Sequence, residues 1–563
     1  MNWKKQYEEK KALDQLEENN LTRIIRSTLS NDKLHVCFGG GVGAFGRNFT
    51  IFYYNGSTIW IDAGCGFPSY NLPGLLRTIP PKELIEAFPP DAIIFTHAHE
   101  DHIGALPYIY RFIDEDTPVY ASDFTIAIIK KRLRDCKIDL NYFQFIPVTK
   151  NSYFKVRDFT INNFFVPHSI PQSFSVGVRI EEINMKIFFS SDFKLQGNEK
   201  NFNEKEIQNY GPVKYLFCDS TGILNSGKST NENKVIENLE QIVQNWPGRI
   251  FMTTFASQIE RLSEISKIAK KYNRHLGIRG QSIITHLESA FEARVLTESF
   301  WNTRRPDPEQ KNAVWIISGC QADEGSSFQR FSDGKLYPLK PEKGDLLIYS
   351  ASVIPSNTDT VFNVLNKLSR IGVKIIGLAD YDPKVHTSGH ARVEDLKQYI
   401  SWLCPEKLIP VHGDHMHFMK FYEILENNKE IDINILEDNC IYSLENNVNE
   451  IMRIPAIPQM IEEKEIHTEY SLYSYRLNLS VSGICNLIIR EDIKKLEQLQ
   501  YIGTCSQEWL KKCMPELSKQ INSLLLKMAN TNENSRNRKL KQKISKINLS
   551  VLGKNPYVNV VWI

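Results

Sequence analysis

The hexapeptide His97-Ala98-His99-Glu100-Asp101-His102 constrains the fold of this chain more than any other part of its sequence. Burying three histidines and an aspartate without partners would cost several kcal/mol, whereas a bound metal ion removes that cost. Imidazole with carboxylate suits zinc, and the carboxylate share leaves manganese open. Residues 103–106 can begin a helix that places Asp101 and His102 beside a second ion. The hexapeptide therefore predicts a site for two divalent cations, and a histidine-rich surface loop is the alternative.

Short apolar runs, typical of buried strands, lead to residues that can bind metal or carry a proton. From residue 34 onward these runs are separated by glycine, proline and asparagine, as strands and loops are. Loops above a rigid sheet commonly present functional groups at the ends of strands. Six runs end in this way and point to one site, at Asp62, His97, His168, Asp192, Asp219 and His412.

The length of the chain and the order of its strand and helix patterns predict several domains. A chain of 563 residues exceeds the size at which one hydrophobic core keeps growing. Residues 1–32 have the spacing of a charged helical arm. Strand and helix patterns alternate from 226 to 382, between Asp219 and His390, which indicates an inserted α/β domain. After residue 455 the pattern changes to a polar, lysine-rich helical stretch at 524–546 and a terminal strand at 557–563.

Composition excludes several classes of function. No apolar run approaches the roughly 18 residues that a membrane span needs, and the charged N-terminus lacks the apolar core of a secretory signal. Ten cysteines without a Cys-x-x-Cys pair indicate reduced thiols, so we expect a cytoplasmic protein. A net charge of +2 gives no general attraction to polyanions. Nucleic acid would therefore have to bind in a local groove.

The pattern His-x-His-x-Asp-His resembles the signature of the metallo-β-lactamase superfamily, and further polar residues follow in that superfamily's order. The resemblance implies that one metal ion is held by His97, His99 and His168. It implies that a second is held by Asp101, His102 and His412, and that both are bridged by Asp192. Asp62 matches a family aspartate that orients the loop instead of binding metal.

A narrower resemblance connects the chain to the ribonuclease J family within the β-CASP subgroup. It rests on collinear blocks of sequence at 39–48, 96–107, 168–171, 191–194, 219–221, 254–257, 386–390 and 410–414. The resemblance implies an α/β fold: an αββα metallo-β-lactamase sandwich with an inserted β-CASP domain and a small C-terminal α/β domain. The expected boundaries are 1–32 for the arm, 33–225 and 383–455 for the two parts of the metallo-β-lactamase domain, 226–382 for the insertion and 456–563 for the C-terminal domain.

The same resemblance implies a metal-dependent ribonuclease that hydrolyses RNA phosphodiester bonds and leaves 5′-phosphate and 3′-hydroxyl ends. A histidine at 412 resembles the RNA-cleaving members, since the DNA-processing members usually carry valine there. His390 is expected to protonate the leaving 3′ oxygen, with Asp219 orienting it or raising its pKa, and Asp101 completes the catalytic set. Contacts with the substrate are expected from His386, Ser388, Ser257 and Ser282.

The part of the insertion that would receive the 5′ end of the RNA departs from the family pattern. Gln281 stands where the family usually has arginine, which removes a charged, bidentate phosphate donor. The balance between 5′–3′ exonuclease and endonuclease action is therefore open. A DNA or structure-specific nuclease on the same scaffold and a non-catalytic RNA-binding protein are the alternatives. The last strand resembles that of the family's C-terminal domain, which predicts a homodimer.

Overall fold

The structure is a computed structural model of the chain. The described residues are 21–66, 75–150, 152–297, 307–308, 310–354, 357–379, 382–426, 430–454, 459–462, 465–467, 483–490, 495–502, 504, 507–528, 533–552 and 556–562. The chain divides into two compact units, Met1–Gly66 with Ile79–Ala456 and Phe67–Thr78 with Ile457–Ile563. Of the expected N-terminal arm, residues 21–28 are helical, and the part before residue 21 lies outside the described residues.

Two β-sheets of the first unit share one hydrophobic core. The first sheet has the order β21 (Val448–Arg453), β20 (Cys440–Leu444), β1 (Leu34–Gly40), β2 (Phe49–Tyr54), β3 (Ser57–Ile61), β5 (Ala92–Phe95), β6 (Pro118–Ala121), β7 (Gln144–Pro147). The second has the order β19 (Asp432–Ile433), β18 (Lys407–Val411), β12 (Tyr215–Asp219), β11 (Met185–Phe189), β10 (Phe174–Ile180), β9 (Phe159–Phe165), β8 (Tyr153–Val156). Phe217 joins the two sheets, because its ring packs against Phe38 and Phe52.

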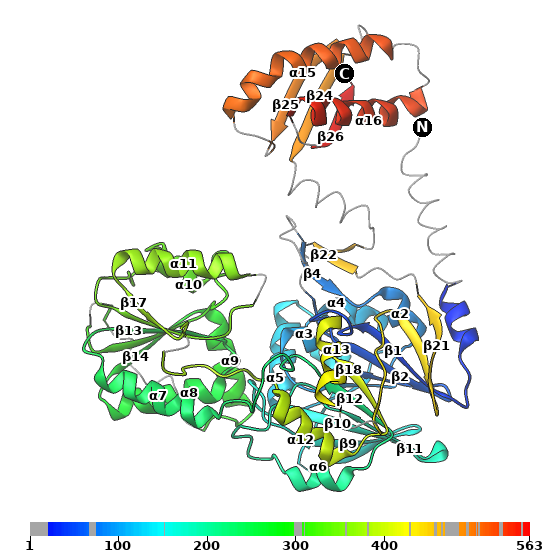
Figure 1. Ribbon diagram of the computed structural model, residues 1–563, viewed down its shortest axis with the longest axis vertical. Helices are drawn as coiled ribbons and strands as arrows, with labels where there is room; N and C mark the ends of the chain where they lie inside the picture. Colours follow the sequence, from blue (N-terminus) through cyan, green and yellow to red (C-terminus); the bar gives the residue numbers. More distant parts are fainter. Residues whose placement is uncertain are drawn as a thin grey trace. The chain divides into compact units, whose positions relative to one another are not determined.

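Helices cover the outer faces of these two sheets (Figure 1). On the first sheet lie α2 (Lys82–Ala87), α3 (Glu100–Ile103), α4 (Leu106–Ile109) and α5 (Asp123–Asp135). On the second lie α6 (Glu204–Tyr210), α12 (Val393–Leu403) and α13 (His415–Ile424). A second core forms there, where Tyr399 of α12 stacks on Phe193 and packs against Phe188 of β11. The predicted αββα sandwich is confirmed.

Parallel strand pairing gathers the predicted functional residues at one edge of the sandwich. In the first sheet β3 pairs in parallel with β5, so Asp62 and His97 follow neighbouring strands. In the second sheet β11, β12 and β18 are parallel neighbours, and their carboxyl ends carry or precede Asp192, Asp219 and His412. The carboxyl ends of adjacent parallel strands lie at the same edge, and this pairing therefore assembles the site.

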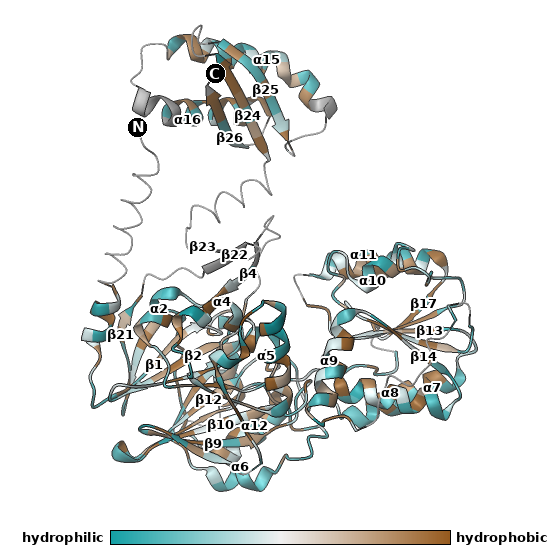
Figure 2. Ribbon diagram, turned by 180° about the vertical axis from the view of Figure 1, so that it is seen from behind, coloured by the Kyte–Doolittle hydropathy of each residue, from teal (hydrophilic) through white to brown (hydrophobic). Residues whose placement is uncertain are grey.

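The insertion is a separate α/β layer structure within the first unit. Its five strands are parallel, in the order β14 (His275–Arg279), β15 (Ala313–Ile317), β13 (Ile250–Thr254), β16 (Leu346–Ser350), β17 (Lys374–Ile376). Helices α7 (Glu232–Asn245) and α8 (Ile259–Lys271) lie on one face, and α10 (Ser327–Ser332) and α11 (Thr358–Ile371) on the other (Figure 1). Figure 2 shows the apolar strands between these amphipathic helices. The predicted alternation of strands and helices is confirmed.

The second unit contains a three-stranded sheet covered by two helices. The strands have the order β25 (Lys495–Ile502), β24 (Ile484–Arg490), β26 (Tyr557–Trp562), and the helices are α15 (Gln507–Lys527) and α16 (Glu533–Leu552). The expected helical stretch at 524–546 falls on the end of α15 and most of α16, and the helical region begins earlier, at Gln507. A further small sheet joins β4 (Leu75–Ile79), β22 (Gln459–Glu462) and β23 (Glu465–His467). Within the described ranges, no helix has the length and apolar character needed to span a membrane.

Candidate active site

The hexapeptide lies in a loop whose conformation is set by Asp62. Asp62 accepts hydrogen bonds from the backbone N–H of Thr96 at 2.8 Å and from the Thr96 hydroxyl at 2.9 Å. These bonds connect the ends of β3 and β5. The backbone then stays extended through His99 and turns into α3 at Glu100, earlier than the expected start at residue 103. Asp101 and His102 thus lie in the first turn of a short helix, which brings the His102 ring to 4.0 Å from that of His97, measured between centroids.

A first group of ligand atoms comes from His97, His99, His168 and Asp192, all within 4.8 Å of one another. The Nδ1 atom of His99 lies 3.1 Å from His97 Nε2 and 3.2 Å from His168 Nε2. Asp192 Oδ2 lies 3.6 Å from His97 Nε2 and 3.7 Å from His168 Nε2. Three imidazole nitrogens and a carboxylate oxygen converge as ligands of one cation do.

A second group comes from Asp101, His102 and His412, again within 4.8 Å of one another. Asp101 Oδ2 lies 3.2 Å from His412 Nε2 and 3.7 Å from His102 Nε2. Asp192 adjoins this group too, with Oδ2 3.4 Å from His102 Nε2 and Oδ1 3.0 Å from His412 Nδ1. Asp192 therefore lies between the two groups, where a bridging carboxylate would be.

The outward nitrogens of four of these histidines are held by neighbouring groups. Asp62 Oδ2 lies 2.7 Å from His102 Nδ1, and the carbonyl of Gly389 lies 2.8 Å from His168 Nδ1. The Thr96 hydroxyl lies 3.0 Å from His97 Nδ1, and the Ser257 hydroxyl lies 3.2 Å from His99 Nε2. Such partners fix the ring orientation and leave the other nitrogen free for a metal ion. Asp62 thus contacts the ring of His102 as well as the backbone of the loop.

The charges at the site fit bound cations. Burial lowers the pKa of His97 and His168 well below the ordinary range and that of His99 to about 4, so these rings are neutral and each offers a nitrogen lone pair. Burial opposes ionisation of Asp101 and Asp192, but the histidines around them lower their pKa below the ordinary value. Among the described ion pairs, no lysine or arginine contacts either carboxylate. The neighbouring carboxylates raise the pKa of His102 to about 10 and that of His412 well above its ordinary value, and bound divalent cations would take the place of these protons.

His390 and Asp219 form a hydrogen-bonded pair beside the two groups. His390 Nδ1 lies 2.8 Å from Asp219 Oδ2, and His390 Nε2 lies 3.9 Å from Asp192 Oδ2. The Asp219 side chain is 1% exposed and that of His390 is 18% exposed, so the pair has one open end. Burial would lower the pKa of His390, but Asp219 and Asp192 outweigh it and raise that pKa above its ordinary value.

His386 is held by residues of the insertion. Its Nδ1 accepts from the guanidinium of Arg261 at 3.0 Å, and its Nε2 lies 2.8 Å from the hydroxyl of Ser352. Burial and the charge of Arg261 hold the pKa of His386 well below its usual range. The ring is therefore neutral with its proton on Nε2. Arg261 is itself fully buried and pairs with Glu232 through contacts of 2.7 and 2.9 Å.

The other expected substrate contacts are not equally close to the ligand groups. Ser257 reaches His99, as described above, whereas the Ser388 hydroxyl accepts from the backbone N–H of His390 at 3.2 Å. Ser282 and Gln281 lie exposed at the start of α9 (Gln281–Glu292). Among the described hydrogen bonds, none connects either of these two side chains to the histidine cluster.

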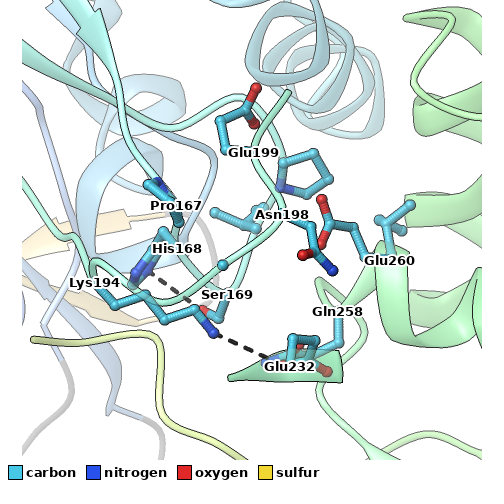
Figure 3. A pocket seen from close by; sticks show the side chains of 13 residues that line it. Pro167, His168, Ser169, Lys194, Asn198, Glu199, Glu232, Gln258 and Glu260 are labelled. Carbon is cyan, nitrogen blue, oxygen red and sulfur yellow. Dashed lines mark hydrogen bonds and ion pairs between the residues drawn. The ribbon is translucent and has the colours of Figure 1, made fainter. Parts of the chain in front are cut away.

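An acidic pocket adjoins the first ligand group, where the chain after β11 meets the insertion (Figure 3). Ser169 lies 3.3 Å from His168 Nε2 on one side, and Lys194 lies 3.7 Å from Glu232 on the other. Glu199 and Glu260 line the same pocket. Burial and the neighbouring carboxylates raise the pKa of Glu260 to about 7. The surplus of carboxylates over the single lysine disfavours a phosphate group there.

Sequence reasoning did not assign roles to several residues that contact the site. The amide of Asn48 lies 3.0 Å from His102 Nε2 and 3.3 Å from Asp101 Oδ2. The hydroxyl of Thr221 lies 3.1 Å from His412 Nδ1. Both residues belong to the motif blocks at 39–48 and 219–221, which was the available signal. Arg261 and Glu232 carried no signal, because an exposed charged helix would have the same sequence pattern.

Three family models match consecutive parts of the chain. The Beta-lactamase superfamily domain matches residues 57–237, the Ribonuclease J, beta-CASP domain matches 247–368 and the Zn-dependent metallo-hydrolase RNA specificity domain matches 383–436. Their order follows the order expected from the motifs.

Curated relatives named Ribonuclease J align with most of the chain. The protein from Thermus thermophilus is 30% identical over 403 residues, 69% of this chain and 69% of its own length. That from Mycoplasma genitalium is 28% identical over 486 residues, 80% of this chain and 84% of its length. That from Corynebacterium glutamicum is 30% identical over 415 residues, and this chain spans 56% of that relative. A crystal structure of a protein of unknown function from Enterococcus faecalis has a similar fold, with a TM-score of 0.53 at 18% identity over 73% of this chain and all of that one.

Proposed function

The chain belongs to the ribonuclease J family, and we propose that it is a metal-dependent ribonuclease that hydrolyses phosphodiester bonds of RNA. One observation carries this proposal: the His390–Asp219 pair opens onto two ligand groups that adjoin the same carboxylate, Asp192. A proton donor beside a paired-cation site is what in-line hydrolysis of a phosphodiester requires. A DNA nuclease and a non-catalytic RNA-binding protein are not favoured, since the relatives are ribonucleases and no ligand position is replaced.

We assign two divalent cations to the site, with zinc first and manganese as the alternative. One would be held by His97, His99 and His168, the other by Asp101, His102 and His412, with Asp192 shared. When bound, the cations supply a nucleophile from water at neutral pH and offset negative charge on the phosphate. Asp62, Thr96 and Ser257 act on this step by keeping the ligand rings in place.

His390 supplies the proton that the leaving group needs. Its Nδ1–H donates to Asp219, so its Nε2–H is the proton that faces the metal ligands. As the bond between phosphorus and the 3′ oxygen breaks, this proton passes to the oxygen and forms a 3′-hydroxyl. The other product retains a 5′-phosphate. Asp219 stabilises the charged imidazole before the transfer and is a positioning residue.

His386 and its neighbours complete the substrate side of the site. A neutral His386 with its proton on Nε2 donates a hydrogen bond to a phosphate oxygen once Ser352 yields that position. Ser257 and Ser388 are further candidates for this side, through their contacts with His99 and with the backbone of His390. Ser282 and the exposed Gln281 offer polar but uncharged groups to the 5′ end. The proposal therefore includes 5′–3′ exonuclease action, endonuclease action or both.

Digestion of end-labelled RNA tests this function. Matched RNA and DNA oligonucleotides, with either a 5′-monophosphate or a 5′-triphosphate, are incubated with zinc- or manganese-loaded protein. Cleavage of RNA but not DNA is expected, and His390→Ala should slow it by about 10²- to 10⁴-fold while metal content stays near normal. Full activity of that variant contradicts the role of His390. Mononucleotides released from the monophosphate substrate alone indicate an exonuclease, and internal fragments alone indicate an endonuclease.

We also propose a homodimer formed through the second unit. Cys485, Leu487 and Ile489 of β24 are buried, whereas Ile484 and Ile488 point to the opposite, less buried face of the sheet. Val561 pairs with Ile488 and is 45% exposed. Exposed apolar side chains on a sheet face are typical of an interface. Sedimentation should give a dimer that Val561→Asp converts to a monomer, and a wild-type monomer at working concentration contradicts the proposal.

We propose the cytoplasm as the compartment. The described cysteines are free, and most of them are buried inside their domains. Free thiols in this number are usual where glutathione keeps cysteine reduced. Alkylation should count the same number of thiols in the protein as purified and in a sample that was first treated with a reductant.

A further inference from the structure

The loop between β1 and β2 is held firmly beside the metal ligands. The backbone N–H of Gly43 donates to the carbonyl of Gly413 at 3.1 Å, next to His412. Arg47 forms an ion pair of 3.2 Å with Asp438 in which both side chains are largely buried. Gly43 has a φ of +85°, which other residues rarely adopt and which lets the chain turn sharply here. The loop is therefore fixed at its base while its tip faces solvent.

Phe45 lies at the tip of this loop and is 45% exposed. Its ring packs edge-to-face against the candidate ligand His412, with centroids 5.9 Å apart, and against His417, with centroids 5.1 Å apart. The two histidines fix the ring from one side only. The ring therefore lies at the rim of the candidate phosphodiester site, on a loop that is held at its base, with part of its surface open to a substrate.

We propose that Phe45 is a base-stacking residue that holds a nucleotide next to the scissile phosphate. The inference rests on the proposed ribonuclease function and adds a specificity-determining residue to it. Once a phosphate is seated among the metal ligands, the sugar and base attached to it lie within reach of the ring that contacts His412. Bases of single-stranded nucleic acid stack on such aromatic faces regardless of sequence.

Stacking at this position gives the site a source of RNA affinity that does not depend on charge. The net charge of +2 provides little general attraction, and the pocket beside His168 is lined by carboxylates. Removal of one aromatic platform weakens binding by about 5- to 150-fold in comparable complexes. We expect Phe45→Leu to raise KM by a factor in this range. Leucine keeps an apolar contact with His412 and His417 but offers no aromatic face.

A substrate that lacks one base separates stacking from mere packing on the histidines. Cleavage of a short RNA is measured with a single abasic ribose placed at each position around the scissile bond. Wild-type protein should lose affinity at one of these positions by the same factor that Phe45→Leu loses on intact RNA. Phe45→Leu should lose nothing further at that position, because the stacking partner is already absent. Phe45→Trp should retain wild-type KM.

The matched control is Tyr153→Leu, which removes an exposed aromatic ring from the edge strand β8. Its KM should equal that of wild type, and metal content and kcat should be unchanged in all Phe45 variants. The stacking role is overturned if Phe45→Leu lowers metal content or kcat while KM is unchanged. It is also overturned if removing the base raises the KM of Phe45→Leu by the same further factor as it raises that of the wild type. If wild-type protein cleaves DNA and not RNA, the ribonuclease proposal itself fails. If it cleaves RNA and Phe45→Leu has normal KM, the stacking proposal alone fails.

Discussion

Replacing Asp219 with asparagine should slow RNA cleavage without removing the metal ions. The carboxylate lies 2.8 Å from His390 Nδ1 and stabilises the protonated imidazole that donates to the leaving oxygen. A hydrogen bond to an ionised group contributes about 1.5–3 kcal/mol, and each 1.36 kcal/mol is tenfold in rate. The expected loss in kcat is therefore about 10- to 150-fold. Complete removal of a general acid costs about 10²- to 10⁴-fold, so His390→Ala should be slower still.

The pH dependence of the same variant gives a second, independent readout. In the wild type, Asp219 raises the pKa of His390 and keeps the acid protonated to higher pH. Asparagine removes that charge, so the pKa of His390 falls and the rate should begin to decline at a lower pH than in the wild type. Single-turnover cleavage of end-labelled RNA between mildly acidic and alkaline pH measures both effects. An unchanged alkaline limb, or a loss of metal content equal to the loss of rate, would refute the reasoning.

Three further predictions concern the ligands and their support. His412→Ala should remove one of two bound cations, measured by metal analysis of dialysed protein, and retention of both contradicts its role as a ligand. Gly64→Ala should disrupt the ligand loop, because the added Cβ would lie 1.6 Å from the Asp101 carbonyl; calorimetric unfolding at unchanged temperature would contradict this. Arg261→Met should lower the free energy of unfolding by about 3–5 kcal/mol, since the buried charge of Glu232 loses its nearer partner and keeps only Lys194 at 3.7 Å. Adding Glu232→Gln should recover part of the loss, and denaturant unfolding measures both.

The strands, and the gathering of the candidate ligands at their ends, could be predicted from sequence because the signals are local. A short apolar run that stops at a histidine or aspartate marks both a buried strand and its polar end. Parallel pairing then brings such ends together, as with Asp219 and His412 on the adjacent strands β12 and β18. The hexapeptide predicts a metal site almost without reference to the rest of the sequence. The conformation of its own loop was harder to predict. The early start of α3 depends on the hydrogen bond that the Thr96 backbone N–H donates to Asp62, and this bond connects the ends of two strands.

Supporting contacts made across large sequence separations could not be predicted. Arg261 bonds to Glu232 and to His386 from separate segments, yet Arg261 and Glu232 each have the sequence context of a surface residue. Phe45 is a similar case, because a loop phenylalanine gives no indication of whether it is exposed or buried. Its exposure follows from the fixed base of the loop and the contacts with His412 and His417.

Metal reconstitution tests the central claim most directly. The metal-free protein is titrated with zinc or manganese while bound metal and cleavage of end-labelled RNA are followed together. Activity should appear as the second cation binds, and the products should carry 5′-phosphate and 3′-hydroxyl ends. Full RNA cleavage by the metal-free protein, or two bound cations with no cleavage of RNA, would contradict the account.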